Sequence, residues 1–200
     1  TAGIGRTDPD GHRVAGQGVT QVASGDEAVL PRFLQAGEAE AFRRRCPHIP
    51  CEITGVGLAA AAAATARTIV AERPERLLLA GIAGAYPASD VAVGETVAVV
   101  EERVAGLPAK YADAYRPTLD LPELRTAVSN SVSRSGAEAA GADLENMEGA
   151  AFFAVATALG VPAAEVRAVS NRVGQPFAEW RGAEACEALA REVERIINEI

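Results

Sequence analysis

An apolar helix that is followed at once by an apolar strand constrains the fold of this chain more than any other feature. Residues 149–159 are apolar and rich in Ala and Phe, which is typical of a buried helix, and Gly160 suits the position just after its end. Residues 161–169 are predicted to form the next strand, and a polar pair, Ser170 and Asn171, follows it. Because helices and strands alternate along the chain, the sequence predicts an α/β layered domain.

The two ends of this helix–strand unit carry side chains that suit a ligand. Glu148 precedes the helix, and Asn171 stands just past the predicted end of the strand. We expect the two ends to face a common edge of the α/β layer, where ligands usually bind in such domains. From the residues alone, Glu148 is equally an ordinary first-turn acid that complements the helix dipole. Asn171 is likewise open to interpretation as a turn residue.

The rest of the chain predicts further elements around this unit. Residues 1–18 are rich in Gly and polar residues and are expected to form an irregular arm, whereas residues 19–200 are expected to form one domain. A glycine-rich loop is expected at residues 81–84. Helices are expected at residues 27–41, 58–72 and 181–200, and strands at residues 19–22, 49–54, 76–80, 91–100 and 128–132.

Charge and composition exclude several classes of partner. The net charge of −8 argues against nucleic acid as the main partner, because a phosphate backbone requires a basic face. The longest apolar run, at residues 58–66, is too short to cross a bilayer, and no signal-peptide pattern is visible. Three cysteines without framework spacing fit a reduced cytoplasm. The sequence therefore predicts a cytoplasmic globular protein that binds neither nucleic acid nor membranes.

Five short blocks together carry a family resemblance. They are ENMEGAAFF at residues 145–153, RAVSN at 167–171, GVG at 55–57, GIAGAY at 81–86 and DVAVGETV at 90–97. Their order and spacing resemble the signature of the purine nucleoside phosphorylase and nucleosidase superfamily. The form with Ser-Asn after the last strand most resembles the futalosine hydrolase family. The span of residues 103–143 is shorter than its counterpart in that family.

This resemblance implies a fold and an activity. The implied fold is an α/β domain with a central mixed, twisted sheet, partly closed into a barrel and flanked by helices. The implied reaction is the hydrolysis of the N-glycosidic bond of a purine nucleoside, with release of hypoxanthine from futalosine in menaquinone biosynthesis. No metal or organic cofactor is implied, and a homo-oligomer is expected. Open alternatives are a phosphorolytic enzyme, a methylthioadenosine-type nucleosidase, and a nucleoside-binding protein without catalysis.

The resemblance also assigns roles to individual residues. Asn171 would hold the base, since its amide can pair with N7 and O6 of a 6-oxopurine. Glu148 would accept hydrogen bonds from the ribose hydroxyls, and Met147 would pack on the sugar. Glu27 would activate the water, although Asp26 competes for this role and Glu27 is otherwise a solvated acid at a helix start. The remaining expected substrate contacts are Ile82, Ala83, Gly84, Asn146, Ser170 and Phe177.

Two groups of side chains near these motifs need separate interpretation. Phe152, Phe153, Phe177 and Trp180 are all near the site in sequence, but only one of them is expected to contact the base, and Phe177 and Trp180 follow the Asn171 segment and could close over it. The pattern Cys46-x-His48-x-x-Cys51 lacks the second pair of ligands that structural zinc requires, so no metal site is predicted.

Overall fold

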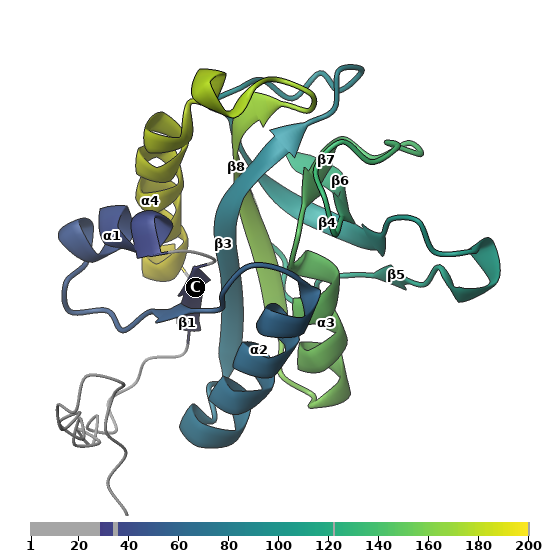
Figure 1. The fold of residues 1–200 in the computed structure, drawn as a ribbon. Coiled ribbons are helices and arrows are strands. Elements are labelled where there is room, and N and C mark those ends of the chain that lie inside the picture. The colour runs from purple at the N-terminus through teal and green to yellow at the C-terminus, as the bar shows by residue number, and fades with distance from the viewer. Residues whose placement is uncertain (1–28, 34–35, 122, 200) are drawn as a thin grey trace, which may run out of the picture.

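The computed structural model describes residues 29–33, 36–121 and 123–199 (Figure 1). The helices are α1 (Ala36–Arg45), α2 (Leu58–Glu72), α3 (Gly149–Ala158) and α4 (Gly182–Glu199), with short 3₁₀ turns at Ala109–Tyr111 and Phe177–Glu179. The strands are β1 (Val29–Phe33), β2 (Glu52–Ile53), β3 (Arg76–Ala85), β4 (Thr96–Val104), β5 (Ala114–Tyr115), β6 (Thr126–Ser131), β7 (Leu144–Asn146) and β8 (Ala163–Arg172).

Five of the strands close into a ring. β3 pairs with β8 in parallel and with β7 in antiparallel orientation, β8 pairs with β4, β4 with β6, and β6 with β7. β1 and β2 extend the sheet beyond β3, so that the sheet is open on that side. The mixed, partly barrel-like sheet implied by the resemblance is therefore confirmed.

Helices cover both faces of the two long strands β3 and β8. Because successive side chains of a strand point to opposite faces, Leu78 packs on one side and Leu77 on the other. α1 and α4 form the core on the Leu78 side, and α2 and α3 form the core on the Leu77 side (Figure 1). The two long strands are therefore buried between two pairs of helices.

Several predicted elements are confirmed. α2 has the predicted bounds, and α3 ends where Gly160 takes a positive φ of 71°. In α4 the predicted apolar stripe is buried at Ala185, Leu189, Val193 and Ile196. β2, β4 and β6 lie within or overlap the predicted strand segments. The predicted arm at residues 1–18 and strand at residues 19–22 lie outside the described residues.

The predicted helix at residues 27–41 is wrong in its first half. Residues 29–33 form β1, which pairs in parallel with β3, and the helix begins only at Ala36. Pro31 is the physical reason, because proline is poorly tolerated inside a helix, whereas here it lies within the strand. The start of the helix therefore moves by nine residues, which changes which acidic residue stands in its first turn.

The predicted loop at residues 81–84 is also wrong, because β3 continues through it to Ala85. β8 pairs with β3 along its whole length and β7 pairs with its last two residues. Neither Gly81 nor Gly84 has a positive φ, so the glycines do not break the strand. The strand predicted at residues 161–169 likewise extends to Arg172, which places Asn171 inside β8 rather than after it.

Candidate active site

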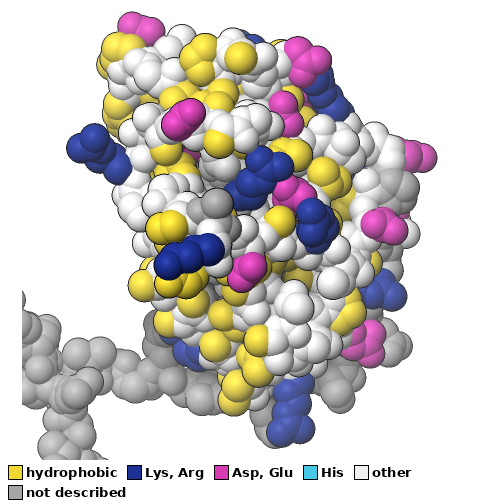
Figure 2. Space-filling view, turned by 90° about the vertical axis from the view of Figure 1, so that its right-hand side faces the viewer, with side chains coloured by type: hydrophobic (Ala, Val, Ile, Leu, Met, Phe, Trp, Pro, Cys, Tyr) yellow, Lys and Arg dark blue, Asp and Glu magenta, His cyan; other side chains and the backbone are white. Residues whose placement is uncertain are grey.

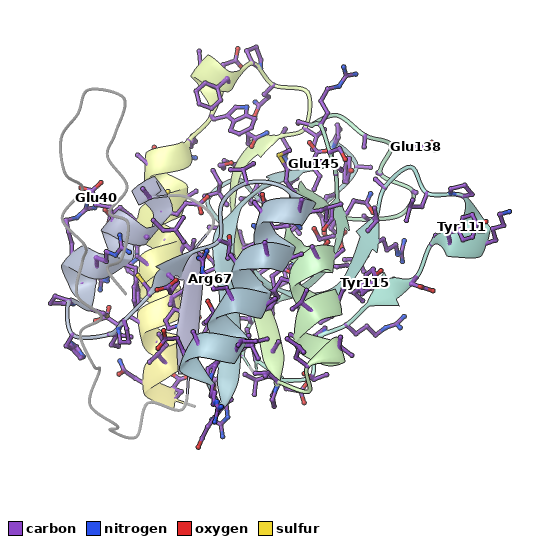
Figure 3. All side chains as sticks on the ribbon, turned by 60° about the horizontal axis from the view of Figure 1, so that its bottom comes forward. Glu40, Arg67, Tyr111, Tyr115, Glu138 and Glu145 are labelled. Carbon is purple, nitrogen blue, oxygen red and sulfur yellow. The ribbon has the colours of Figure 1, made fainter. Side chains whose placement is uncertain are left out.

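A pocket of about 110 Å³ lies where the parallel strands β3 and β8 end. The first turn of α1, the loop before α2 and the segments after β6, β7 and β8 complete its wall. Glu145 lines the pocket, whereas Tyr111 lies far from Glu145, at the tip of the segment between β4 and β5 (Figure 3). The pocket is lined by Glu38, Val56, Ile82, Ala83, Gly84, Val132, Ser135, Glu145, Asn146, Met147, Glu148, Ser170, Asn171 and Trp180.

Glu148 lines this pocket and is held by backbone donors. Its Oε1 accepts a hydrogen bond from the Gly57 N–H at 3.0 Å, and its Oε2 accepts one from the Met147 N–H at 3.1 Å. Gly57 has a φ of 92°, which favours glycine, and this conformation lets the loop before α2 present its N–H to the carboxylate. Although only 2% exposed, Glu148 is placed at the pocket wall, where it can accept further hydrogen bonds.

Ser170 and Asn171 lie together at the end of β8. The Ser170 hydroxyl donates to Asn171 Oδ1 at 2.8 Å, and Asn171 Nδ2 donates to the Arg172 carbonyl at 3.0 Å. These two bonds fix which way the amide faces and leave one N–H and one lone pair for a ligand. A Cβ atom on Gly84 of β3 would lie 3.2 Å from Asn171 Nδ2, so the absence of a side chain at Gly84 leaves room for the Asn171 amide.

The other predicted contacts divide into two groups. Ile82, Ala83 and Met147 line the pocket together with Gly84. Phe177 does not, since its side chain is 82% exposed and its ring packs on Trp180 with the centroids 5.1 Å apart. Trp180 is thus the aromatic side chain that lines the pocket, while Phe152 and Phe153 belong to the core between α3 and the sheet.

Asn146 also lines the pocket, but its amide is occupied by protein groups. Its Oδ1 accepts hydrogen bonds from the backbone N–H groups of Glu148 and Gly149 and from Arg167. Its Nδ2 donates to Glu102 and to Ser129. All the hydrogen-bonding capacity of the amide is used in this way, so Asn146 orients the start of α3 instead of offering bonds to a ligand.

Sequence reasoning missed Glu38, in the first turn of α1. This side chain is 3% exposed, lines the pocket, and accepts a hydrogen bond from the Ile82 N–H at 3.4 Å. The signal for it was an acid in the first turn of the first helix, but placing that helix too early pointed to Glu27 instead. Glu27 lies outside the described residues, so its role stays a prediction.

A buried polar cluster lies behind Glu148. Arg167 is paired with Glu165 at 2.6 Å and lies 3.7 Å from Glu148, and Glu102 accepts a hydrogen bond from Ser131 at 2.7 Å. Burial raises the pKa of Glu102 to about 8, and the charge of Glu165 acts in the same direction. Burial lowers the pKa of Arg167, but its glutamate neighbours outweigh this effect and raise it overall.

The pocket is strongly acidic. Three carboxylates line it, those of Glu38, Glu145 and Glu148, and no Lys, Arg or His side chain is found among its described lining residues. Outside the pocket, basic and acidic side chains are interspersed on the face that Figure 2 shows. Within the described ranges, no three His, Cys, Asp or Glu side chains are grouped so as to hold a metal ion. Nor does any described helix have the length and apolarity to span a membrane.

Comparison with known proteins agrees with this architecture. Residues 132–198 match the model of the phosphorylase superfamily. The futalosine hydrolase of Helicobacter pylori superimposes with a TM-score of 0.77 at 13% identity, covering 86% of this chain and 97% of that structure. A methylthioadenosine/S-adenosylhomocysteine nucleosidase of the same organism gives 0.77 at 15% identity, covering 88% and 100%. At such low identity these structures establish the fold alone.

Two curated relatives are much closer in sequence. The futalosine hydrolase of Thermus thermophilus is 39% identical over 180 residues, covering 73% of this chain and 80% of the relative. The futalosine hydrolase of Streptomyces coelicolor is 36% identical over 178 residues, covering 71% and 75%. With this identity over most of both chains, the protein belongs to the futalosine hydrolase family within the phosphorylase superfamily.

Proposed function

We propose that this protein is an N-glycosyl hydrolase that uses water to release hypoxanthine from futalosine. The observation that carries the proposal is a small pocket that is lined by a backbone-held carboxylate, Glu148, an oriented amide, Asn171, and a further buried carboxylate, Glu38. The two curated relatives are futalosine hydrolases, which supports this substrate.

Glu148 is proposed to hold the ribose. N-glycosidic cleavage passes through an oxocarbenium-like transition state, and an ionised carboxylate bound to the ribose hydroxyls steadies the sugar as positive charge builds on it. The backbone N–H groups of Gly57 and Met147 fix the carboxylate before the substrate binds. This pre-organisation means that no reorientation is required during the reaction.

Asn171 is proposed to bind the leaving base. Its remaining N–H can donate a hydrogen bond to O6 or to an unprotonated N7 of hypoxanthine. Its remaining lone pair can accept a hydrogen bond from N7 when N7 carries a proton. An amide cannot transfer a proton as an acid, so its help to the leaving group is hydrogen bonding alone. Trp180 would supply an apolar wall beside the base.

Glu38 is proposed to activate the water. A general base must lie within hydrogen-bond reach of the water that it deprotonates, and Glu38 is a buried carboxylate that lines the pocket. The water oxygen forms a bond to C1′ while the C1′–N9 bond breaks and its electron pair passes to the base. One water proton goes to Glu38, which later releases it to solvent, and the departing base takes up one proton from solvent to become neutral hypoxanthine.

The charge of the pocket favours hydrolysis over phosphorolysis. A phosphorylase must bind an anion beside the sugar, usually with Arg side chains and backbone N–H groups. Arg167 lies behind Glu148 and is paired with Glu165, and no described residue that lines the pocket is a cation. Three carboxylates around the same space would repel phosphate.

The decisive experiment measures free base released from futalosine, inosine and methylthioadenosine, each with and without phosphate. Release of hypoxanthine from futalosine without phosphate is the expected result. Release only with phosphate would move the protein to the phosphorylases, and release only from methylthioadenosine would move it to the other nucleosidases. A protein that binds these nucleosides without releasing base would be a binding protein.

The cellular setting is proposed from the sequence. We infer a role in menaquinone biosynthesis and a homo-oligomer from the resemblance, and a cytoplasmic location from three cysteines that have no framework spacing. Light scattering on the purified protein tests the oligomer, and a gene deletion followed by menaquinone analysis tests the pathway.

A further inference from the structure

Two buried carboxyl groups with no part in the proposed chemistry face each other behind the pocket. We call Glu102, from β4, and Glu165, from β8, the acid pair. Both are fully buried, and no solvent reaches either of them. Two ionised carboxylates side by side in such a place repel each other strongly, so one proton is expected to be retained between them.

The geometry shows where that proton is required. Glu165 Oε2 accepts no hydrogen bond from any donor in the part of the chain that the structure describes. A Cβ atom placed on Gly149 would lie 2.6 Å from this oxygen and also 2.6 Å from Glu102 Oε1. The two oxygens thus approach the same point, and a proton on Glu102 would supply the donor that Glu165 Oε2 lacks.

The neighbours decide which carboxyl keeps the proton. Arg167 donates from Nε to Glu165 Oε1 at 2.6 Å, which favours the ionised form of Glu165. The hydrogen bonds that Glu102 accepts come from the neutral side chains of Ser131 and Asn146. Burial raises the pKa of both carboxyl groups and Arg167 lowers both, but the short hydrogen bond of Arg167 goes to Glu165.

Arg167 connects the acid pair to the pocket. Its guanidinium pairs with Glu165, donates to Asn146 Oδ1 at 3.0 Å, and stays 3.7 Å from Glu148 Oε2. If Glu165 became neutral, the only ionised carboxylate left beside Arg167 would be Glu148. A closer pairing with Arg167 would weaken Glu148 as an acceptor for ribose hydroxyls and draw it away from Gly57 and Met147.

We propose that Glu102 is a neutral acid that donates a hydrogen bond to ionised Glu165, and that this pair retains Arg167 so that Glu148 remains free to bind the ribose. Glu102, Glu165 and Arg167 are thus positioning residues, because they act through Glu148 and Asn146. The link to ribose binding rests on the proposed function, whereas the protonation of the acid pair does not.

Two isosteric variants form a matched test, because each removes one carboxyl group of the same pair. In Glu102→Gln the amide can still donate to Glu165, at the cost of the hydrogen bond that Glu102 Oε1 accepts from Asn146. In Glu165→Gln, Arg167 loses its ionised partner. We expect Glu165→Gln to lower kcat/KM for futalosine about tenfold more than Glu102→Gln does, mainly by raising KM. Equal losses, or a greater loss in Glu102→Gln, would overturn the proposed assignment.

A spectroscopic readout tests the proton itself. Carbon-13 NMR of protein labelled at the glutamate carboxyl carbons should show one carboxyl group that is still protonated at neutral pH, and Glu102→Gln should remove that signal. A spectrum in which every glutamate is ionised at neutral pH would overturn the proposal, even if Glu165→Gln did not fold. A wild-type protein that shows the signal but releases no base from futalosine would refute the proposed function, but the proposed protonation of the acid pair would still hold.

Discussion

At the scale of single residues, substitution of Glu148 tests the proposed site most directly. Glu148→Gln keeps an oxygen for the Gly57 N–H but removes the ionised acceptor from the ribose. Hydrogen bonds to charged groups contribute about 1.5–3 kcal/mol, so we expect kcat/KM for futalosine to fall roughly 10- to 100-fold. Steady-state kinetics on the two proteins checks this.

Glu145→Gln is the control for that variant. Glu145 lines the same pocket, but its carboxylate accepts hydrogen bonds from the Gly136 N–H at 3.0 Å and from Ser135, in the segment after β6. Its neutralisation should therefore reduce activity less than that of Glu148. Equal losses would mean that the overall charge of the pocket matters, and not a specific contact with the ribose.

A second prediction at this scale separates Glu38 from Glu27. Loss of a general base typically reduces the rate about 10²–10⁴-fold, so Glu38→Gln should lower kcat strongly with a smaller change in KM. Glu27→Gln is the matched variant that tests the competing prediction from the sequence, and if Glu38 is the base it should leave kcat nearly unchanged. Single-turnover release of hypoxanthine measures the chemical step directly. A fall in rate in Glu27→Gln with none in Glu38→Gln would reverse the assignment.

At the scale of elements, the start of α3 is built around Gly149. An added Cβ would meet Glu102 and Glu165 at 2.6 Å inside a packed interior. Overpacking of this kind typically destabilises a protein by about 1–3 kcal/mol, and we expect Gly149→Ala to lower the free energy of unfolding by that order. Denaturant titration measures it.

Gly182→Ala provides the control at the corresponding position of another helix. Gly182 is the first residue of α4, and a Cβ there would meet nothing within 4 Å. Since alanine favours the helix over glycine, this variant should be neutral or slightly stabilising. A similar loss of stability in both variants would show that the effect belongs to helix starts in general and not to the acid pair.

The elements also show what a sequence can and cannot predict. The helices α2 and α3 were predictable because they are long apolar runs rich in Ala that end before Pro74 and Gly160, and α4 was predictable because its apolar residues recur with a helical period. β3 was predicted too short because glycines usually indicate a loop, and only pairing with β7 and β8 keeps Gly81 and Gly84 extended. That pairing is non-local and leaves no trace in the segment itself.

The residues of the candidate site also differ in whether local sequence could predict them. Glu148 and Asn171 were predictable because they flank one contiguous helix–strand unit. Glu38 was missed because its position depends on where the first helix starts, and Pro31 shifted that start. The roles of Glu102 and Arg167 were invisible to sequence reasoning, since β4 and β8 bring them together from positions 65 residues apart.

At the scale of the whole molecule, the acid pair makes stability depend on pH. Burial raises the pKa of Glu102 from 4.5 to about 8, so the folded protein keeps a proton that the unfolded chain releases. The stability associated with this group is fully present below pH 4.5 and is lost as the pH rises through about 8. The free energy of unfolding should therefore decline across this window and level off above it.

Denaturant titrations at several pH values across that window, on wild type and Glu102→Gln, test this prediction. The variant has no proton to lose at this position, so its free energy of unfolding should decline less steeply with pH. Half-buried acids such as Glu101, whose pKa is lowered by its hydrogen bond to Arg103, respond in the opposite direction and are common to both proteins. Parallel curves for the two proteins would mean that Glu102 is already ionised in the fold, and that Arg167 is shared by three charged carboxylates.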